Sequence, residues 1–112
     1  MKKIEAVIRP EQVSAVRRAL ERVGYSGLMI GDINGHGAQK GKVEQWRGET
    51  YKVELLAKTK IDIIVKDSDL AAIVTAIKEA AKTGQIGDGK IFVSDIENVI
   101  RIRTGEEGNM AL

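Results

Sequence analysis

The sequence has no cysteine and only one histidine, His36, among its 112 residues. The missing cysteine excludes disulfides, thiolate metal sites and cysteine catalysis. With one histidine, the chain cannot build a zinc site from two histidines. Nothing in the sequence resembles a serine–histidine–aspartate set either. We therefore interpret His36 as a solvated loop residue.

Long apolar runs and a strong charge of one sign are also missing. No segment approaches the roughly 20 apolar residues of a membrane-spanning helix, and no apolar stretch opens the chain, so we expect a cytoplasmic protein. The formal net charge of +2 is too small to favour nucleic-acid binding by bulk electrostatics. The remaining composition, 43% hydrophobic and 30% charged, is typical of one globular domain over residues 1–112.

Hydrophobic periodicity in the first half predicts a strand, a helix and a second strand. Residues 2–9 alternate between apolar and polar side chains, as in a half-buried strand. Apolar residues then recur at helical spacing from Val13 to Val23, and Gly24 is a natural helix stop. We expect a second, less regular strand at residues 27–34.

The second half repeats this order. It predicts a strand near residues 57–66, a helix capped by Asp67 or Ser68 with its apolar stripe over 70–81, and a strand at about 89–96. Two such halves joined by a long loop give an α+β, ferredoxin-like domain. In that fold two helices cover one face of an antiparallel sheet.

The other face of this sheet would mix polar and apolar side chains. Its expected members are Val7, Lys58, Lys60, Asp62 and Ile64. A face of this kind often meets another subunit, and the alternative is an ordinary solvated face with stray valines.

A long polar loop is expected over about residues 36–54. A loop of this length in a compact domain is usually either functional or disordered. Trp46, Arg47 and Tyr51 lie near its expected tip and are residue types that anchor interfaces. The alternative is a hairpin whose aromatic residues fold back onto the body.

The expected sheet offers only Phe92 for base stacking, which disfavours an RNA-recognition module.

Residues 83–92 read Thr-Gly-Gln-Ile-Gly-Asp-Gly-Lys-Ile-Phe, between an expected helix and an expected strand. Glycines let backbone N–H groups approach a ligand, and a lysine such as Lys90 at the end of a turn suits phosphate. The alternative is a helix cap at Gly84 followed by a tight turn.

Arg101 and Arg103 lie two residues apart in the C-terminal segment, about residues 97–112. On an extended backbone they would project to the same side, as a pair of bidentate donors for phosphate. The alternative is a surface strand whose arginines balance Glu106 and Glu107.

These motifs resemble the PII signal-transduction proteins, the nitrogen-regulatory family with its GlnB and GlnK types. The resemblance runs from end to end and rests on Met1–Ala6, Gly35–Gly41, Arg47-Gly48 before Tyr51, Thr83–Phe92 and Val99–Glu106. The 83–92 segment is specific, unlike an isolated pair of glycines.

The resemblance implies a homotrimer that binds ATP or ADP between subunits, and 2-oxoglutarate beside Mg²⁺-ATP. It implies that the loop at 36–54, the T-loop of the family, docks onto a nitrogen-metabolism protein such as an ammonium transporter or glutamine synthetase. A membrane would be involved only through a transporter partner. We expect a regulator rather than an enzyme. The alternatives are a PII-like regulator that does not sense 2-oxoglutarate and, more remotely, an acylphosphatase-like enzyme with Arg9 in its anion cradle.

The resemblance also assigns residues to sites. The implied nucleotide site comprises Val7, Gly35, Gly37, Ala38, Gln39, Asp62, Ile64, Gly87, Asp88, Gly89, Lys90, Arg101 and Arg103. The implied 2-oxoglutarate site comprises Gln39, Lys40, Lys58 and Gly87, with Gln39 also near the Mg²⁺ of ATP. The implied partner contacts are Trp46, Arg47 and Tyr51.

Three positions depart from the family pattern. Ala38 stands where the family usually has arginine, which would remove a charge-assisted contact of about 1.5–3 kcal/mol unless Lys40 compensates. Trp46 replaces a common tyrosine. Thr50 replaces the glutamate that usually precedes a modifiable tyrosine, so Tyr51 is either a modification site or an unmodified contact residue.

Overall fold

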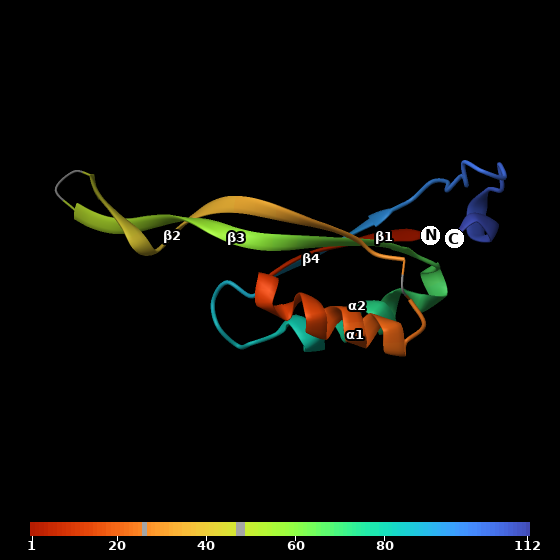
Figure 1. Ribbon diagram of the computed structural model, residues 1–112, viewed down its shortest axis with the longest axis horizontal. Helices are drawn as coiled ribbons and strands as arrows, with labels where there is room; N and C mark the ends of the chain where they lie inside the picture. Colours follow the sequence, from red (N-terminus) through yellow and green to blue (C-terminus); the bar gives the residue numbers. More distant parts are fainter. Residues whose placement is uncertain (26, 47–48) are drawn as a thin grey trace.

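A computed structural model describes the backbone of residues 1–25, 27–46 and 49–112, and the side chains of these residues except 34–46 and 49–56. The main elements are β1 (Lys2–Ile8), α1 (Val13–Arg22), β2 (Met29–Trp46), β3 (Glu49–Val65), α2 (Leu70–Ala81) and β4 (Gly89–Asp95). All sheet pairings are antiparallel, in the order β2-β3-β1-β4. Both helices cover one face of the sheet (Figure 1), so the predicted ferredoxin-like fold is confirmed.

The core lies between this sheet and the two helices. In β1, the alternation predicted from sequence places Ile4, Ala6 and Ile8 in the core. The other fully buried apolar side chains come from both helices and β3, and are Val16, Leu20, Ile61, Ile63, Val65, Ile73 and Ile77. Both predicted helical stripes therefore face the sheet, except that Val23 lies beyond the end of α1 and is 44% exposed.

The segment predicted as a polar loop forms the outer part of a long β hairpin. Strands β2 and β3 stay paired from Met29 opposite Asp62 to Trp46 opposite Glu49, with one irregularity between Ala38 and Lys42. The hairpin extends beyond the body of the molecule (Figure 1), whose longest dimension is 60 Å. Its frequent glycines and polar residues indicated a loop. In a two-stranded ladder the inward backbone groups pair with each other and the outward groups can bond to water, so the ladder forms without a buried face.

The helix α2 begins without the predicted side-chain cap. A short 3-10 turn at Asp67–Asp69 leads into α2, and no side chain bonds to its first backbone N–H groups. The Asp67 carboxylate instead pairs with the terminal amine of Met1 at 2.8 Å, which lowers the pKa of this carboxyl.

Within the described residues, no helix is both long and apolar enough to cross a membrane.

The C-terminal segment leaves β4 and folds into a compact turn. Ile100 bridges Glu107, and the Gly105 N–H donates to the Arg101 carbonyl at 2.8 Å. The prediction that Arg101 and Arg103 share one side of an extended strand is therefore wrong. Gly105 adopts φ +74°, a conformation that glycine permits and that reverses the chain here.

Candidate phosphate-binding site

The turn between α2 and β4 is organised around the carboxylate of Asp88. One oxygen, Oδ2, accepts the backbone N–H groups of Thr83 and Gly84, each at 2.9 Å. The other oxygen, Oδ1, accepts the Thr83 hydroxyl and, at 3.0 Å, the Arg9 Nε. The hydrogen bonds from Thr83, helped by those from Arg9 and Gly84, hold the pKa of Asp88 well below its ordinary range.

Arg9 binds this turn at two points. Besides its bond to Asp88, its Nη2 donates to the Ile86 carbonyl at 2.8 Å. Arg9 follows β1, and because Ile8 pairs with Gly89 it lies beside the turn. Two of its three guanidinium nitrogens, Nε and Nη2, are therefore bonded to the turn, which disfavours the anion cradle of the acylphosphatase-like alternative.

Lys58 reaches the same turn from β3. Its ammonium donates to the Gly87 carbonyl. Lys58 pairs with Ile33 of β2, and the next pairs along the hairpin are Asn34 with Ala57 and Gly35 with Leu56. The turn therefore contacts β3 at the base of the hairpin.

Gly89 is required where the turn enters β4. A Cβ at this position would lie 1.8 Å from the Val7 carbonyl oxygen, and the backbone there has φ +106°. The next residue, Lys90, pairs with Val7 across β1 and β4, which places both on the helix-free face. Lys90 is exposed and Val7 half-buried. The structure thus brings together Val7, Gly87, Asp88, Gly89, Lys90 and Lys58.

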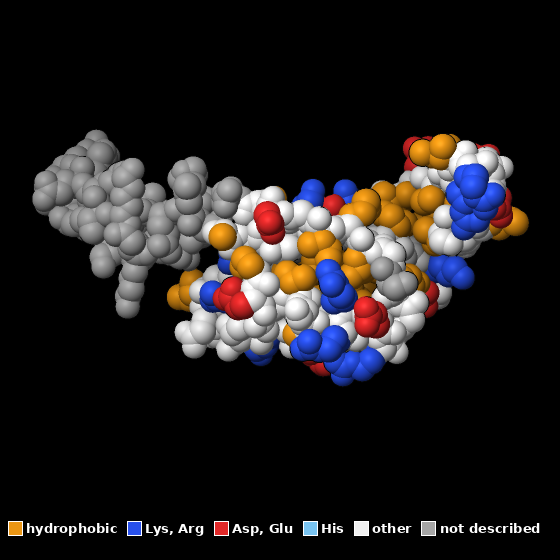
Figure 2. Space-filling model, in the orientation of Figure 1, with side chains coloured by type: hydrophobic (Ala, Val, Ile, Leu, Met, Phe, Trp, Pro, Cys, Tyr) orange, Lys and Arg blue, Asp and Glu red, His pale blue; other side chains and the backbone are white. Residues whose placement is uncertain are grey.

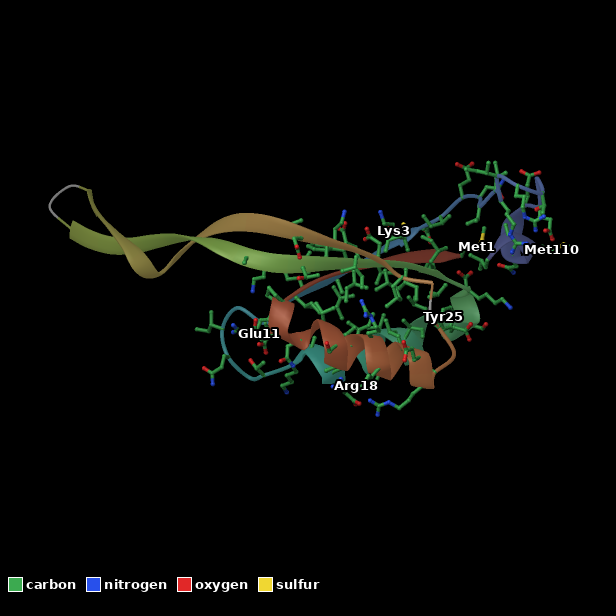
Figure 3. All side chains as sticks on the ribbon, viewed as in Figure 1. Met1, Lys3, Glu11, Arg18, Tyr25 and Met110 are labelled. Atoms are coloured by element: carbon green, nitrogen blue, oxygen red, sulfur yellow. The ribbon has the colours of Figure 1, made fainter. Side chains whose placement is uncertain are left out.

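The remaining described site residues lie elsewhere. Arg101 is paired with Glu106, with Nη1 2.9 Å from Oε1. The alternative interpretation expected this charge balance, but in a surface strand, whereas the segment is a turn. In Figures 1 and 3 the C-terminal segment and Met110 lie at the opposite end of the helix-covered body from the turn and Glu11. The predicted arginine half of the phosphate site therefore does not meet the turn within one chain.

Asp62 and Ile64 lie further along β3, away from the turn and toward the C-terminal segment. The carboxylate of Asp62 lies 3.4 Å from the Lys60 ammonium and raises the pKa of this lysine, with a smaller contribution from Glu5. Its Oδ1 is buried and finds no hydrogen-bond donor within the described part of the chain. Ile64 lines a cleft of about 530 Å³ where the C-terminal segment meets the body, together with Met29 and Leu112. Figure 2 shows hydrophobic side chains exposed in this region.

The predicted sites on the hairpin are described only in their backbone. Gly35, Gly37 and Ala38 belong to the regular ladder. Gln39 and Lys40 fall within the irregularity that follows it, and Trp46 and Tyr51 lie near the end of the hairpin. Their side chains lie outside the described residues, as does the whole of Arg47. Among the described residues, no group of acidic or histidine side chains could hold a metal ion by itself.

Two residues of this arrangement were not assigned to a site from the sequence. Thr83 entered the sequence analysis only as the first residue of the glycine motif, and Arg9 only in the acylphosphatase-like alternative. The signal that could have found Arg9 is the antiparallel register of β1 and β4. A strand that ends at Ile8 opposite Gly89 must place residue 9 next to residue 88.

Comparison with known proteins decides the family. The model of the family "Nitrogen regulatory protein P-II" matches residues 1–106. The chain belongs to the P-II family. It is 48% identical to "Nitrogen regulatory protein P-II 2" of Methanothermobacter thermautotrophicus, over all of this chain and 97% of that relative. It is 50% identical to the P-II protein of Pasteurella multocida over the full length of both chains.

A solved P-II structure has the same fold. The crystal structure of Arabidopsis thaliana PII bound to citrate superposes with a TM-score of 0.82 and 37% sequence identity, over 99% of this chain and 91% of that chain. The P-II relatives carry names of regulatory proteins, in agreement with the predicted role in nitrogen regulation.

Proposed function

We propose that this P-II protein is a cytoplasmic signalling homotrimer that binds ATP or ADP, with Mg²⁺ accompanying ATP, in clefts between its subunits. The observation that carries the proposal is the separation of the two basic half-sites. The turn at 83–90 lies at one end of the helix-covered body, and the C-terminal segment that carries Arg101 and Arg103 lies at the other (Figure 1). A second copy placed end to end would bring its arginines to the turn of the first.

This arrangement is a head-to-tail contact, which closes into a ring when the rotation between subunits allows it. The helix-free side offers surface for such contacts, since Met29 is 56% and Phe92 51% exposed.

The chemistry of both half-sites suits a polyphosphate. Glycines with positive φ at positions 87 and 89 shape a turn whose N–H groups can face an anion. Lys90 supplies a compact charge, and Arg101 and Arg103 supply forked donors. Gly35, Gly37, Ala38 and Gln39 would complete the cleft from the hairpin.

We further propose 2-oxoglutarate as a second effector, bound by Lys58, Gly87 and the hairpin residues Gln39 and Lys40. A carboxylate that takes the Lys58 ammonium would compete with the Gly87 carbonyl, so it would alter the link between turn and hairpin. The Arabidopsis relative was crystallised with citrate, another carboxylate. Such differential contacts are what a ligand needs in order to shift a conformational equilibrium.

The output would be the hairpin itself. Trp46, Arg47 and Tyr51 would contact an ammonium transporter, glutamine synthetase or another nitrogen-metabolism protein, and the bound nucleotide would decide which hairpin conformation is presented. A regulator that binds nucleotide but ignores 2-oxoglutarate is the second candidate, because Ala38 lacks the arginine usual in the family.

Isothermal titration with ATP, ADP and 2-oxoglutarate tests this proposal, together with light scattering to obtain the mass. We expect a mass of three chains, saturable binding of both nucleotides, and 2-oxoglutarate binding only in the presence of Mg²⁺-ATP. Failure to bind either nucleotide would overturn the proposal. Nucleotide binding without any effect of 2-oxoglutarate would support the second candidate.

A further inference from the structure

We infer that Arg9 is a positioning residue of the phosphate site, which shapes the turn at 83–90 and neutralises the Asp88 carboxylate without touching the nucleotide. The inference rests on the proposed nucleotide-binding function and adds to it a residue outside the predicted site.

A carboxylate in a phosphate-binding turn raises an electrostatic problem, because a polyphosphate and Asp88 would repel each other. The structure resolves it through the direction of the carboxylate. Both oxygens point into the turn, where they accept bonds from Thr83, Gly84 and Arg9. Asp88 therefore organises the turn from within, and the Arg9 guanidinium supplies the charge that offsets it.

Arg9 also fixes the direction of backbone donors. The described peptide bonds are all trans, so the N–H of each residue points away from the preceding carbonyl. Arg9 holds the Ile86 carbonyl and thereby orients the Gly87 N–H. Lys58 holds the Gly87 carbonyl and so orients the Asp88 N–H. Two basic side chains thus fix two consecutive N–H groups that the proposed function assigns to phosphate.

The hydrogen bonds of Arg9 direct its guanidinium toward the turn. Its Nε and Nη2 are committed to Asp88 and Ile86, and its side chain is 24% exposed. Lys90, by contrast, is exposed on β4. We therefore assign phosphate contact to Lys90 and support of the turn to Arg9.

Two measurements on Arg9→Met test this inference. Titration with ATP and ADP should show dissociation constants raised about tenfold, the loss expected when a charge-assisted contact is removed. The rise should be larger for ATP than for ADP, since the uncompensated Asp88 charge repels the more highly charged nucleotide more strongly. In nucleotide-free protein, the amides of Thr83 and Gly84 should exchange hydrogen faster than in the unmodified chain.

Arg17→Met is the matched control, because Arg17 is an exposed residue of α1 and its loss changes the net charge equally. It should leave both nucleotide affinities and the exchange rates unchanged. Arg9→Lys retains the charge and should recover the ATP-to-ADP affinity ratio. Combined with Asp88→Asn, Arg9→Met should lower affinity by less than the product of the two single effects, because the two residues act through one pair.

The outcomes separate this inference from the proposed function. If the unmodified protein binds no nucleotide, the proposed function fails, and the exchange measurement alone decides whether Arg9 holds the turn. Unchanged exchange at Thr83 and Gly84 in Arg9→Met would overturn the inference. So would a loss of affinity without faster exchange, since that result would place Arg9 in direct contact with the nucleotide.

Discussion

At the scale of single residues, Asp88 makes the turn sensitive to acid. Its pKa is lowered in the folded protein, so its stabilising bonds are fully present above its ordinary pKa of about 4 and are lost as the pH falls toward the lower folded value. The free energy of unfolding should therefore differ less between the unmodified chain and Asp88→Asn as the pH is lowered from about 5 to about 2. Urea denaturation at several pH values measures this difference. Parallel pH curves for the two proteins would contradict it.

Gly89 provides a second prediction for a single residue. Gly89→Ala should destabilise the protein by about 1–3 kcal/mol, because the new Cβ collides with the Val7 carbonyl and the backbone has positive φ. Gly27→Ala is the control, since a Cβ there meets nothing within 4 Å, and it should change stability by about 0.5 kcal/mol or less. Equal unfolding midpoints for the two variants would show that the turn can move away from β1.

At the scale of secondary-structure elements, prediction from sequence succeeded where the signal was local. The alternation of Ile4, Ala6 and Ile8 arises because one face of a single strand packs against the core. Such a pattern can be identified from the sequence without knowing the fold. The bond between Arg9 and Asp88 joins residues 79 positions apart and depends on the register of β1 and β4. The local pattern at Arg101 and Arg103 was misleading, because the fold of the segment depends on Gly105 and on the bridge to Glu107.

The element that links the hairpin to the turn is β3, through Lys58. Lys58→Met removes the ammonium from the Gly87 carbonyl and from the proposed keto-acid site. We expect the affinity for 2-oxoglutarate to fall at least about tenfold. The affinity for ATP should fall less, because Lys58 orients only one of the several proposed phosphate donors, the Asp88 N–H. Lys66→Met, at an exposed position just after β3, is the charge-matched control. Titration of both variants with 2-oxoglutarate in the presence of Mg²⁺-ATP measures the effect; equal loss in the two variants would assign it to net charge.

At the scale of the whole molecule, the separation of the two half-sites makes a prediction about mixed trimers. Lys90→Glu should damage the turn half of each cleft, and Arg101→Met combined with Arg103→Met should damage the arginine half, so neither homotrimer should bind ATP tightly. In a ring of head-to-tail contacts, a trimer that mixes the two variants has about one cleft in three with both halves intact.

Co-expression of the two variants with different affinity tags isolates such mixed trimers. Titration with ATP should then recover unmodified affinity at about one site per trimer. Purified homotrimers of each variant, titrated at the same concentration, are the controls. Because the turn and the C-terminal segment lie at opposite ends of the helix-covered body, recovery requires a cleft shared between subunits. If every mixed trimer binds as weakly as the parent variants, the two half-sites do not complete each other, and the phosphate site must be built from the turn and the hairpin of a single subunit.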